Sequence, residues 1–317
     1  MLTAERTRPT TLSWRVAVAL ASVYVIWGST YLAIKFTVAP EHGAPIPPML
    51  MAAMRFGLSG ALLLAWAVRR PAADGLPDPI GWPQLRSTLI VALALLIGGN
   101  GLVVLAETRG LDSGITAVIV ASVPLWAALI GAVRRDKPLP PIGLFGVALG
   151  FAGVAALFWP TADAEINTVA ALMVVVGALC WASGSYYSRG APLPRRPLVM
   201  TAIEMLWGAL AFVLLAAARG EFADFAPRSV SAHAWWALVY LTVIGGMVAF
   251  TAYVWLLRNA PMSLATTYAY VNPVVAVFLG WLFANEKLTL RDLIATAVIV
   301  TSVALILSTH RPAPTRA

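Results

Sequence analysis

Long apolar stretches separate the charged residues of this chain. Eight stretches contain no Asp, Glu, Lys or Arg, and two more contain one charge each, Arg55 or Glu204. A helix that crosses a bilayer needs ~20 mostly apolar residues, and each stretch fits one such helix. The ten predicted spans are 16–34, 43–68, 87–106, 113–133, 138–162, 166–188, 197–218, 234–257, 259–285 and 293–309.

The lengths of these stretches decide between helices and barrel strands. Barrel strands are about 10 residues long, and only helices or closed barrels satisfy the backbone in lipid. The composition agrees, because 60% of the residues are hydrophobic and 11% are charged, whereas soluble domains carry roughly 25% charged residues. The sequence therefore predicts an all-α, polytopic membrane protein with the lipid bilayer as its surroundings.

The two halves of the chain match one another. Pro124 and Pro273 lie 149 residues apart in similar apolar segments, and the Gly98-Gly99 and Gly245-Gly246 pairs lie 147 apart. We predict two repeats of five spans, 16–160 and 166–309, with tails at 1–15 and 310–317. Because five is odd, the second repeat enters the membrane from the opposite side. Inverted repeats are typical of transporters that alternate access to a central site.

The distribution of basic residues predicts the orientation. With the N-terminus in the cytoplasm, 15 Lys and Arg fall in inside segments and six in outside segments. This bias predicts a cell (inner) membrane protein with both termini cytoplasmic. The net charge of +8 is thereby explained without a nucleic-acid partner. Cys180 is the single cysteine and no histidine pair lies within a span, so we expect no metal and no cofactor.

Several motifs resemble one transporter family. They are WGSTYLAIKF (27–36), MRF (54–56), GGNG (98–101), VPLW (123–126), CWASGSYYSR (180–189) and YAYVNPVVAVFLGWLFANEKLT (268–289). Together they resemble the EamA family of the drug/metabolite transporter superfamily. The resemblance implies a ten-helix bundle in which helices 1–4 and 6–9 surround a cavity and helices 5 and 10 brace it. That family often has Gly-Glu after the ninth helix, where this chain has Asn285-Glu286.

Arg55 and Glu204 interrupt their spans at matching positions of the two repeats. A charge at the bilayer centre costs ~2.5–3.5 kcal/mol on insertion scales and must face protein or water. Three interpretations stay open. The two side chains pair with one another, or Arg55 binds a substrate carboxylate with Glu204 as counter-charge or proton acceptor, or each is satisfied separately.

Polar and aromatic side chains cluster in the first and sixth spans. Their mixture of ring faces and hydroxyls suits a small amphipathic ligand, and packing between helices is the alternative. The candidates for lining a cavity are Trp27, Ser29, Thr30 and Tyr31 in the first span and Trp181, Ser185 and Tyr186 in the sixth.

Two further spans carry candidate cavity residues beside glycines or a proline: Asn100 in one, and Tyr268, Tyr270 and Asn272 in the other. Pro124 and Pro273 are expected to break their helices, because proline lacks a backbone donor, although a simple kink is an alternative. Glu107, at the end of the third span, is either a solvated end charge or a gate or coupling residue.

The inverted repeat predicts a secondary transporter, and the resemblance to the EamA family implies that it exports amino acids, other small metabolites or drugs. A passive channel or facilitator of the same fold is the alternative. An intramembrane enzyme is disfavoured, because Ser29 and Ser185 have no histidine within any span. The spacing of Gly146 and Gly150, followed by Gly153, fits either packing within one bundle or the seam of a homodimer.

Overall fold

The structure is a computed structural model that describes residues 14–40, 43–70, 80–134, 140–157, 167–260 and 267–308. These residues form helices joined by turns, and no strand occurs among them. The helices are α1 Trp14–Val38, α2 Pro48–Val68, α3 Trp82–Ala92, η2 Leu93–Gly101, α4 Leu102–Glu107, α5 Ser113–Val120, α6 Val123–Val133, α7 Pro141–Leu157, α8 Thr168–Ser188, α9 Pro197–Ala218, α10 Glu221–Asp224, α11 Ala232–Val239, η3 Tyr240–Val248, α12 Ala249–Asn259, α14 Tyr268–Ala284 and α15 Leu290–Ser308.

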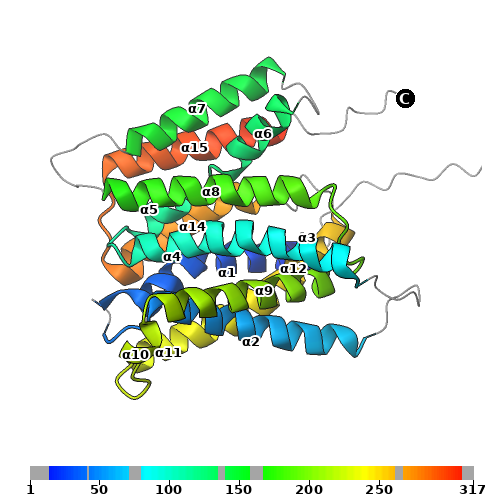
Figure 1. Cartoon of the computed structure of the whole chain (residues 1–317). Helices are drawn as coiled ribbons and strands as arrows, with labels where there is room; N and C mark the ends of the chain where they lie inside the picture. Colours follow the sequence, from blue (N-terminus) through cyan, green and yellow to red (C-terminus); the bar gives the residue numbers. More distant parts are fainter. Residues whose placement is uncertain are drawn as a thin grey trace, which may run out of the picture.

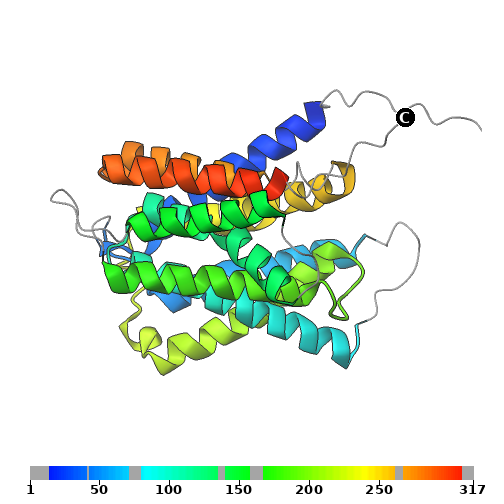
Figure 2. The same cartoon turned by 90° about the horizontal axis from the view of Figure 1, so that it is seen from above.

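The long helices lie side by side in one bundle. α7 packs against α15 along one edge, and α2 packs against α9 toward the opposite edge (Figure 1). Seen from above, the helices again run in one general direction (Figure 2). Within the described residues, seven helical segments are long and apolar enough to cross a membrane, and Pro141–Leu157 and Val271–Ala284 are shorter apolar helices. The prediction of an all-helical, multi-pass membrane protein is confirmed.

Large apolar side chains cover the outside of this bundle. Leu62, Leu144, Leu172, Leu214 and Phe278 are about half exposed or more. Soluble proteins rarely expose apolar surface on this scale, whereas lipid tails accept it without cost. The outward-facing residues of these helices therefore match a bilayer and not water.

Small residues allow the helices to approach closely. A Cβ at Gly150 would lie 2.4 Å from Leu125 Cδ1 of α6, and one at Gly153 would lie 2.9 Å from Ile299 Cγ1 of α15. The glycine stripe of α7 is therefore covered within the chain, as one of the two interpretations expected.

Two π-helical segments occupy matching places in the two halves. η2 and η3 are nine residues each, begin 147 residues apart, and contain Gly98-Gly99 and Gly245-Gly246 respectively. π-helical turns are rare and are often found at functional sites. In both segments the glycines receive a side chain from another helix, Cys180 at Gly98 and Ser59 at Gly246.

The two prolines behave differently. α5 ends at Val120 and α6 begins at Val123 with Pro124 in its first turn, so the expected break near Pro124 is present. α14 continues through Pro273 as one helix, so the expected break at Pro273 is wrong. Because Pro273 lies in the second turn of α14, the carbonyl of Ala269 alone loses its helical donor.

Candidate functional site

Arg55 is the centre of a buried polar group. Its side chain projects from α2, and its Nη1 donates to Oδ1 of Asn100 on η2 at 3.4 Å. The guanidinium carbon also lies 4.9 Å from the ring centroid of Phe56. Its Nε has no hydrogen-bond partner. Tyr31 of α1 interacts electrostatically with Arg55. The structure therefore brings together three of the predicted residues, Tyr31, Arg55 and Asn100.

Glu204 does not join this group. α2 and α9 run antiparallel, with Gly57 beside Ala209 and Gly60 beside Met205. This register separates Arg55 from Glu204 by about two helical turns. The structure records no ion pair between them, so the interpretation that they pair is wrong. Glu204 is nevertheless buried, and its Oε1 has no partner.

An aromatic cluster joins α1, α12 and α14. The ring of Trp27 lies 5.0 Å from Tyr253 and 5.0 Å from Tyr268, and 6.1 Å from Phe250, measured between centroids. Tilted and edge-on aromatic pairs stabilise a contact by about 0.5–1.5 kcal/mol beyond area burial. Trp27 and Tyr268, two predicted residues, thus meet in a packing contact between helices.

The polar side chains next to this cluster are satisfied within the chain. Ser29 Oγ lies 2.5 Å from the Tyr240 hydroxyl and donates to the Ile26 carbonyl. Thr30 Oγ1 donates to the Trp27 carbonyl at 2.6 Å. The amide of Asn272 lies 3.3 Å from the carbonyls of Tyr268 and Tyr24 and donates to both when its nitrogen faces them. The Ser29–Tyr240 and Asn272–Tyr24 contacts hold α1 against η3 and α14, whereas the Thr30 bond lies within α1.

The candidates of the sixth span lie apart from Arg55. Trp181 packs on η2, where a Cβ at Gly99 would lie 2.8 Å from its Cε3. Arg134 stands 6.0 Å from the ring centroid of Tyr186, and Ser185 is half-buried on α8. The side chain of Tyr270 lies outside the described residues. The structure therefore does not gather all the predicted residues into one site.

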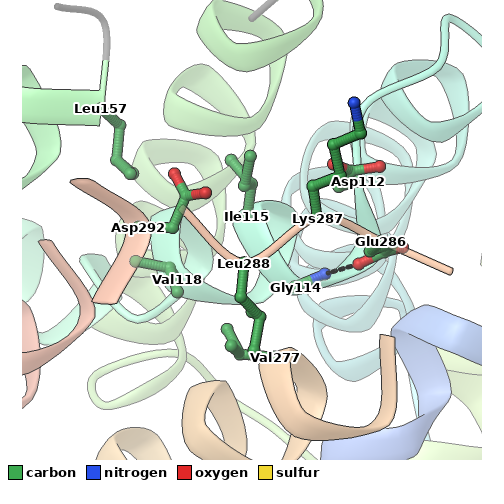
Figure 3. A pocket seen from close by; sticks show the side chains of 10 residues that line it. All are labelled: Asp112, Gly114, Ile115, Val118, Leu157, Val277, Glu286, Lys287, Leu288 and Asp292. Atoms are coloured by element: carbon green, nitrogen blue, oxygen red, sulfur yellow. Dashed lines mark hydrogen bonds between the residues drawn. The ribbon is translucent and has the colours of Figure 1, made fainter. Parts of the chain in front are cut away.

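Within the part of the chain that the structure describes, an ionic cluster forms from residues that were not among the predicted site residues. We call Lys35, Asp112, Ser113, Gly114 and Glu286 the Glu286 cluster. Glu286 Oε1 accepts from Lys35 Nζ at 3.1 Å and from Ser113 N and Oγ at 2.8 Å, and Oε2 accepts from Gly114 N at 3.0 Å. Lys35 Nζ also donates to Asp112 Oδ1 at 3.2 Å. Figure 3 shows Glu286 reaching the start of α5.

This cluster ties three parts of the chain at one end of the bundle. Glu286 supplies acceptors to the free N–H groups of α5, whose positive dipole end favours a carboxylate. Asp112, in the turn before α5, has its pKa raised by burial and by the charge of Glu286, while Lys35 acts in the opposite direction. A cavity of about 10 Å³ beside these side chains is lined by Asp112, Leu157 and Asp292 among others (Figure 3).

The turn that directs Glu286 inward depends on Asn285. Asn285 ends α14 in the left-handed region, with φ 52°, and is the one non-glycine residue with positive φ among those the structure describes. Asparagine adopts this region more readily than most residues. The Gly-Glu pair at this place in the resembled family was the signal that could have identified Glu286.

Glu107 is the second functional candidate that the sequence underrated. It ends α4 and is 1% exposed, and neither carboxylate oxygen has a hydrogen-bond partner. The charges that act on it are those of Glu286, Lys35 and Arg55. The interpretation of Glu107 as a solvated end charge is wrong, because α1, α2, α5 and α8 pack against α4 and this side chain is buried.

A wide groove opens at the other end of α1. Its volume is about 720 Å³, and it lies between α1, α2 and the η3–α12 segment, with Trp14, Trp66 and Trp255 among its lining. This size is within the range of about 300–1,000 Å³ for small-molecule sites. None of the predicted cavity residues with a described side chain lines it. Among the described residues, no three His, Cys, Asp or Glu side chains gather to hold a metal ion.

Comparisons with known proteins match most of the chain to transporters. The model of the EamA-like transporter family matches residues 14–159 and 168–308. The uncharacterized inner membrane transporter YedA of Escherichia coli K12 is 37% identical over 288 residues, covering 91% of this chain and 89% of its own. The uncharacterized transporter YvbV of Bacillus subtilis strain 168 is 25% identical over 304 residues, covering 92% and 91%.

A solved crystal structure has a similar fold. It aligns with a TM-score of 0.58 and covers 92% of this chain and 95% of its own, at 19% sequence identity. At that identity the likeness shows the fold alone.

Proposed function

The chain belongs to the EamA-like transporter family, and we propose that it is a secondary transporter that exports amino acids or other small metabolites by alternating access. The relatives named above are uncharacterized transporters. The fold and the buried polar groups support the substrate class, the direction and the mechanism proposed for this chain.

Reciprocal packing of the two halves is the observation that carries this proposal. α1 packs against η3 and α12, and α8, its counterpart in the second half, packs against η2 and α4. The counterpart pairs α2–α9 and α7–α15 pack against one another. Two inverted five-helix repeats related by a two-fold axis produce this exchange of contacts. Such repeats surround the substrate path in many secondary transporters.

The two ends of the bundle support alternating access. With both termini in the cytoplasm of a cell inner membrane, the Glu286 cluster closes the external end and the 720 Å³ groove opens toward the cytoplasmic end. Export then requires the Glu286 cluster to separate and the groove to close. Lys35, Asp112 and Glu286 are the ionic contacts that change between the two states.

Arg55 is the residue we assign to substrate binding. It is a buried cation with an unpartnered Nε, held by Asn100 beside the η2 π-helix. A guanidinium with free donors suits a carboxylate, as amino acids carry. Tyr31 and Asn100 contribute polar groups at the same place.

Efflux of labelled amino acids from cells overproducing the protein tests this function. We expect faster efflux than in control cells, and loss of that difference in Arg55→Ala with the protein still inserted. The exposed Arg109, changed to Ala, is the matched control and should leave efflux unchanged. Normal efflux from the Arg55→Ala cells would overturn the binding role.

The energy dependence of export distinguishes a secondary transporter from a passive facilitator of the same fold. We expect export against a concentration gradient that a protonophore abolishes. Export that only equilibrates the two sides, with or without the protonophore, would favour the facilitator.

A further inference from the structure

The groove between α1, α2 and the η3–α12 segment opens on the outer face of the bundle. Val18 and Val248, which line it, are both about half exposed. Apolar side chains exposed on a membrane-spanning helix face lipid tails. Leu63 and Met247 are also part of its lining, so the walls stay apolar away from the surface. A molecule that enters this groove from the bilayer therefore needs an apolar body.

Three tryptophans and one arginine gather at one end of this groove. Trp14 and Arg15 are the first two residues of α1, Trp66 lies in the last turn of α2, and Trp255 lies one turn before the end of α12. Indole rings favour the level of the lipid headgroups. This end of the groove therefore lies among the headgroups, and the apolar walls continue from it toward the bilayer interior.

Two guanidinium groups stand at this end. The guanidinium carbon of Arg15 lies 5.8 Å from the ring centroid of Trp14, and that of Arg70, just after α2, lies 4.8 Å from the ring centroid of Trp66. Arg196 fixes the end of α2 by donating from Nη1 to the Arg70 carbonyl at 2.7 Å. Among the described residues, the ion pairs include no carboxylate partner for Arg15 or Arg70.

Basic residues are common at the cytoplasmic ends of membrane helices and need no ligand there. Arg15 and Arg70 differ in their place, because each contacts a tryptophan ring that lines the groove. Guanidinium groups bind phosphate through pairs of parallel hydrogen bonds, and basic clusters beside membrane helices are typical of sites for anionic lipids. An apolar groove with two cations at headgroup level complements a molecule with an apolar tail and a negative headgroup.

We propose that this groove binds an anionic phospholipid from the adjacent membrane leaflet, with an acyl chain along α1 and α12 and the headgroup phosphate at Arg15 and Arg70. Lipid binding does not depend on the substrate or direction of transport. One consequence rests on the proposed function, in which the groove closes when the external end opens. A lipid that binds the open groove then favours the externally closed conformation.

Native mass spectrometry of the full-length protein in detergent micelles tests the preference for a negative headgroup. The probes are dioleoyl phosphatidylglycerol and dioleoyl phosphatidylcholine in equal amounts, which share their acyl chains and differ in net charge. We expect phosphatidylglycerol to be retained in preference, and that preference to fall about fivefold for each of Arg15→Ala and Arg70→Ala. Arg189→Ala, an exposed arginine outside the groove, is the matched control and should keep the preference. Equal retention of the two lipids, or an unchanged preference in Arg15→Ala/Arg70→Ala, would overturn the proposal.

Filling the groove tests the place of the acyl chain. Val248→Trp adds bulk to the lining, and we expect it to reduce the retention of phosphatidylglycerol although both arginines remain. Val243→Trp, at an exposed position of η3 outside the groove, should retain the lipid as the wild type does, and thermal unfolding checks that both variants are folded. Unchanged retention in folded Val248→Trp contradicts the proposal.

The measured mass also identifies any other occupant. A retained amino acid, or a dimer that Val248→Trp dissociates, in place of the lipid would contradict the proposal. Retained phosphatidylglycerol in a protein that exports no amino acid supports the lipid site and counts against the proposed function.

Discussion

Glu286 and Glu107 lie at the same end of the bundle and are both buried, yet their surroundings are opposite. Glu286 receives bonds from Lys35, from the Ser113 hydroxyl and from two backbone N–H groups, whereas neither oxygen of Glu107 receives one. Donors on both oxygens of Glu286 hold it in place in this conformation, because moving it means losing every bond together. No such bond holds the carboxyl group of Glu107. The difference separates a carboxylate that ties helices together from one that does not.

The largest expected effect comes from removing the satisfied carboxylate. Glu286→Ala leaves Lys35 buried with Asp112 as its remaining partner in the cluster, and leaves the start of α5 uncapped. Breaking a buried pair by removing one partner typically costs about 3–5 kcal/mol, and we expect a loss of stability of that size. Thermal unfolding in detergent micelles measures it. The exposed neighbour Lys287, changed to Ala, is the matched control.

A double substitution tests whether Lys35 and Glu286 stabilise the protein as a pair. Removal of both charges in Lys35→Ala/Glu286→Ala should cost less than the sum of the two single changes, because residues in one network are not additive. Strictly additive losses would show that the pair contributes nothing of its own.

Glu221 is a second glutamate that caps a helix, and we expect its contribution to stability to lie between those of Glu286 and Glu107. Glu221 Oε2 accepts from Met49 N at 2.9 Å and Leu50 N at 3.0 Å, and Oε1 accepts from Arg219, whose side chain is 48% exposed. Glu221 thus caps α2, whose own N-cap Pro47 makes no side-chain cap.

Hydrogen bonds to charged groups contribute about 1.5–3 kcal/mol, so we expect Glu221→Ala to lose about 2 kcal/mol. The ion pair with Arg219 adds little because solvent screens it. Arg219→Ala, measured in the same unfolding assay, should therefore have almost no effect. If Glu221→Ala lost as much stability as Glu286→Ala, the two capping glutamates could not be distinguished.

Substitution of Asn285 should change the stability less than substitution of Glu221. Left-handed backbone costs about 1–2 kcal/mol for most residues, so Asn285→Ala should lose about 1 kcal/mol and weaken the hold on Glu286. Asn285→Gly should be as stable as the wild type, since glycine adopts this conformation freely. Equal stability of the Ala and Gly variants in thermal unfolding would contradict this account.

The smallest effect on stability is expected at Glu107. No hydrogen bond is lost in Glu107→Gln, so we expect a change of less than about 0.5 kcal/mol, or a gain. Unfolding measured beside Glu286→Ala makes the comparison direct. A loss of several kcal/mol would mean that Glu107 is a structural group like Glu286, and the contrast between the two regions would disappear.

The positions of the helices could be predicted from the sequence because length and apolarity are local properties. A run of ~20 apolar residues specifies a membrane helix whatever surrounds it. The matching glycine pairs, 147 residues apart, could also be read from the sequence, but the π-helical form of both segments is seen only in the structure. Among the polar residues, the burial of Arg55 and Glu204 followed from their place inside apolar runs.

The partners of the charged groups could not be predicted this way. Lys35 and Glu286 are 251 residues apart, and only the packing of α1, α5 and α14 brings them together. The same packing separated Arg55 from Glu204, which the sequence had made equivalent, and buried Glu107, which the sequence placed at a helix end. Sequence by itself thus determined the membrane class and the all-helical fold. Only the tertiary structure decided which charges are satisfied, because an ion pair or hydrogen bond forms only over a few ångströms.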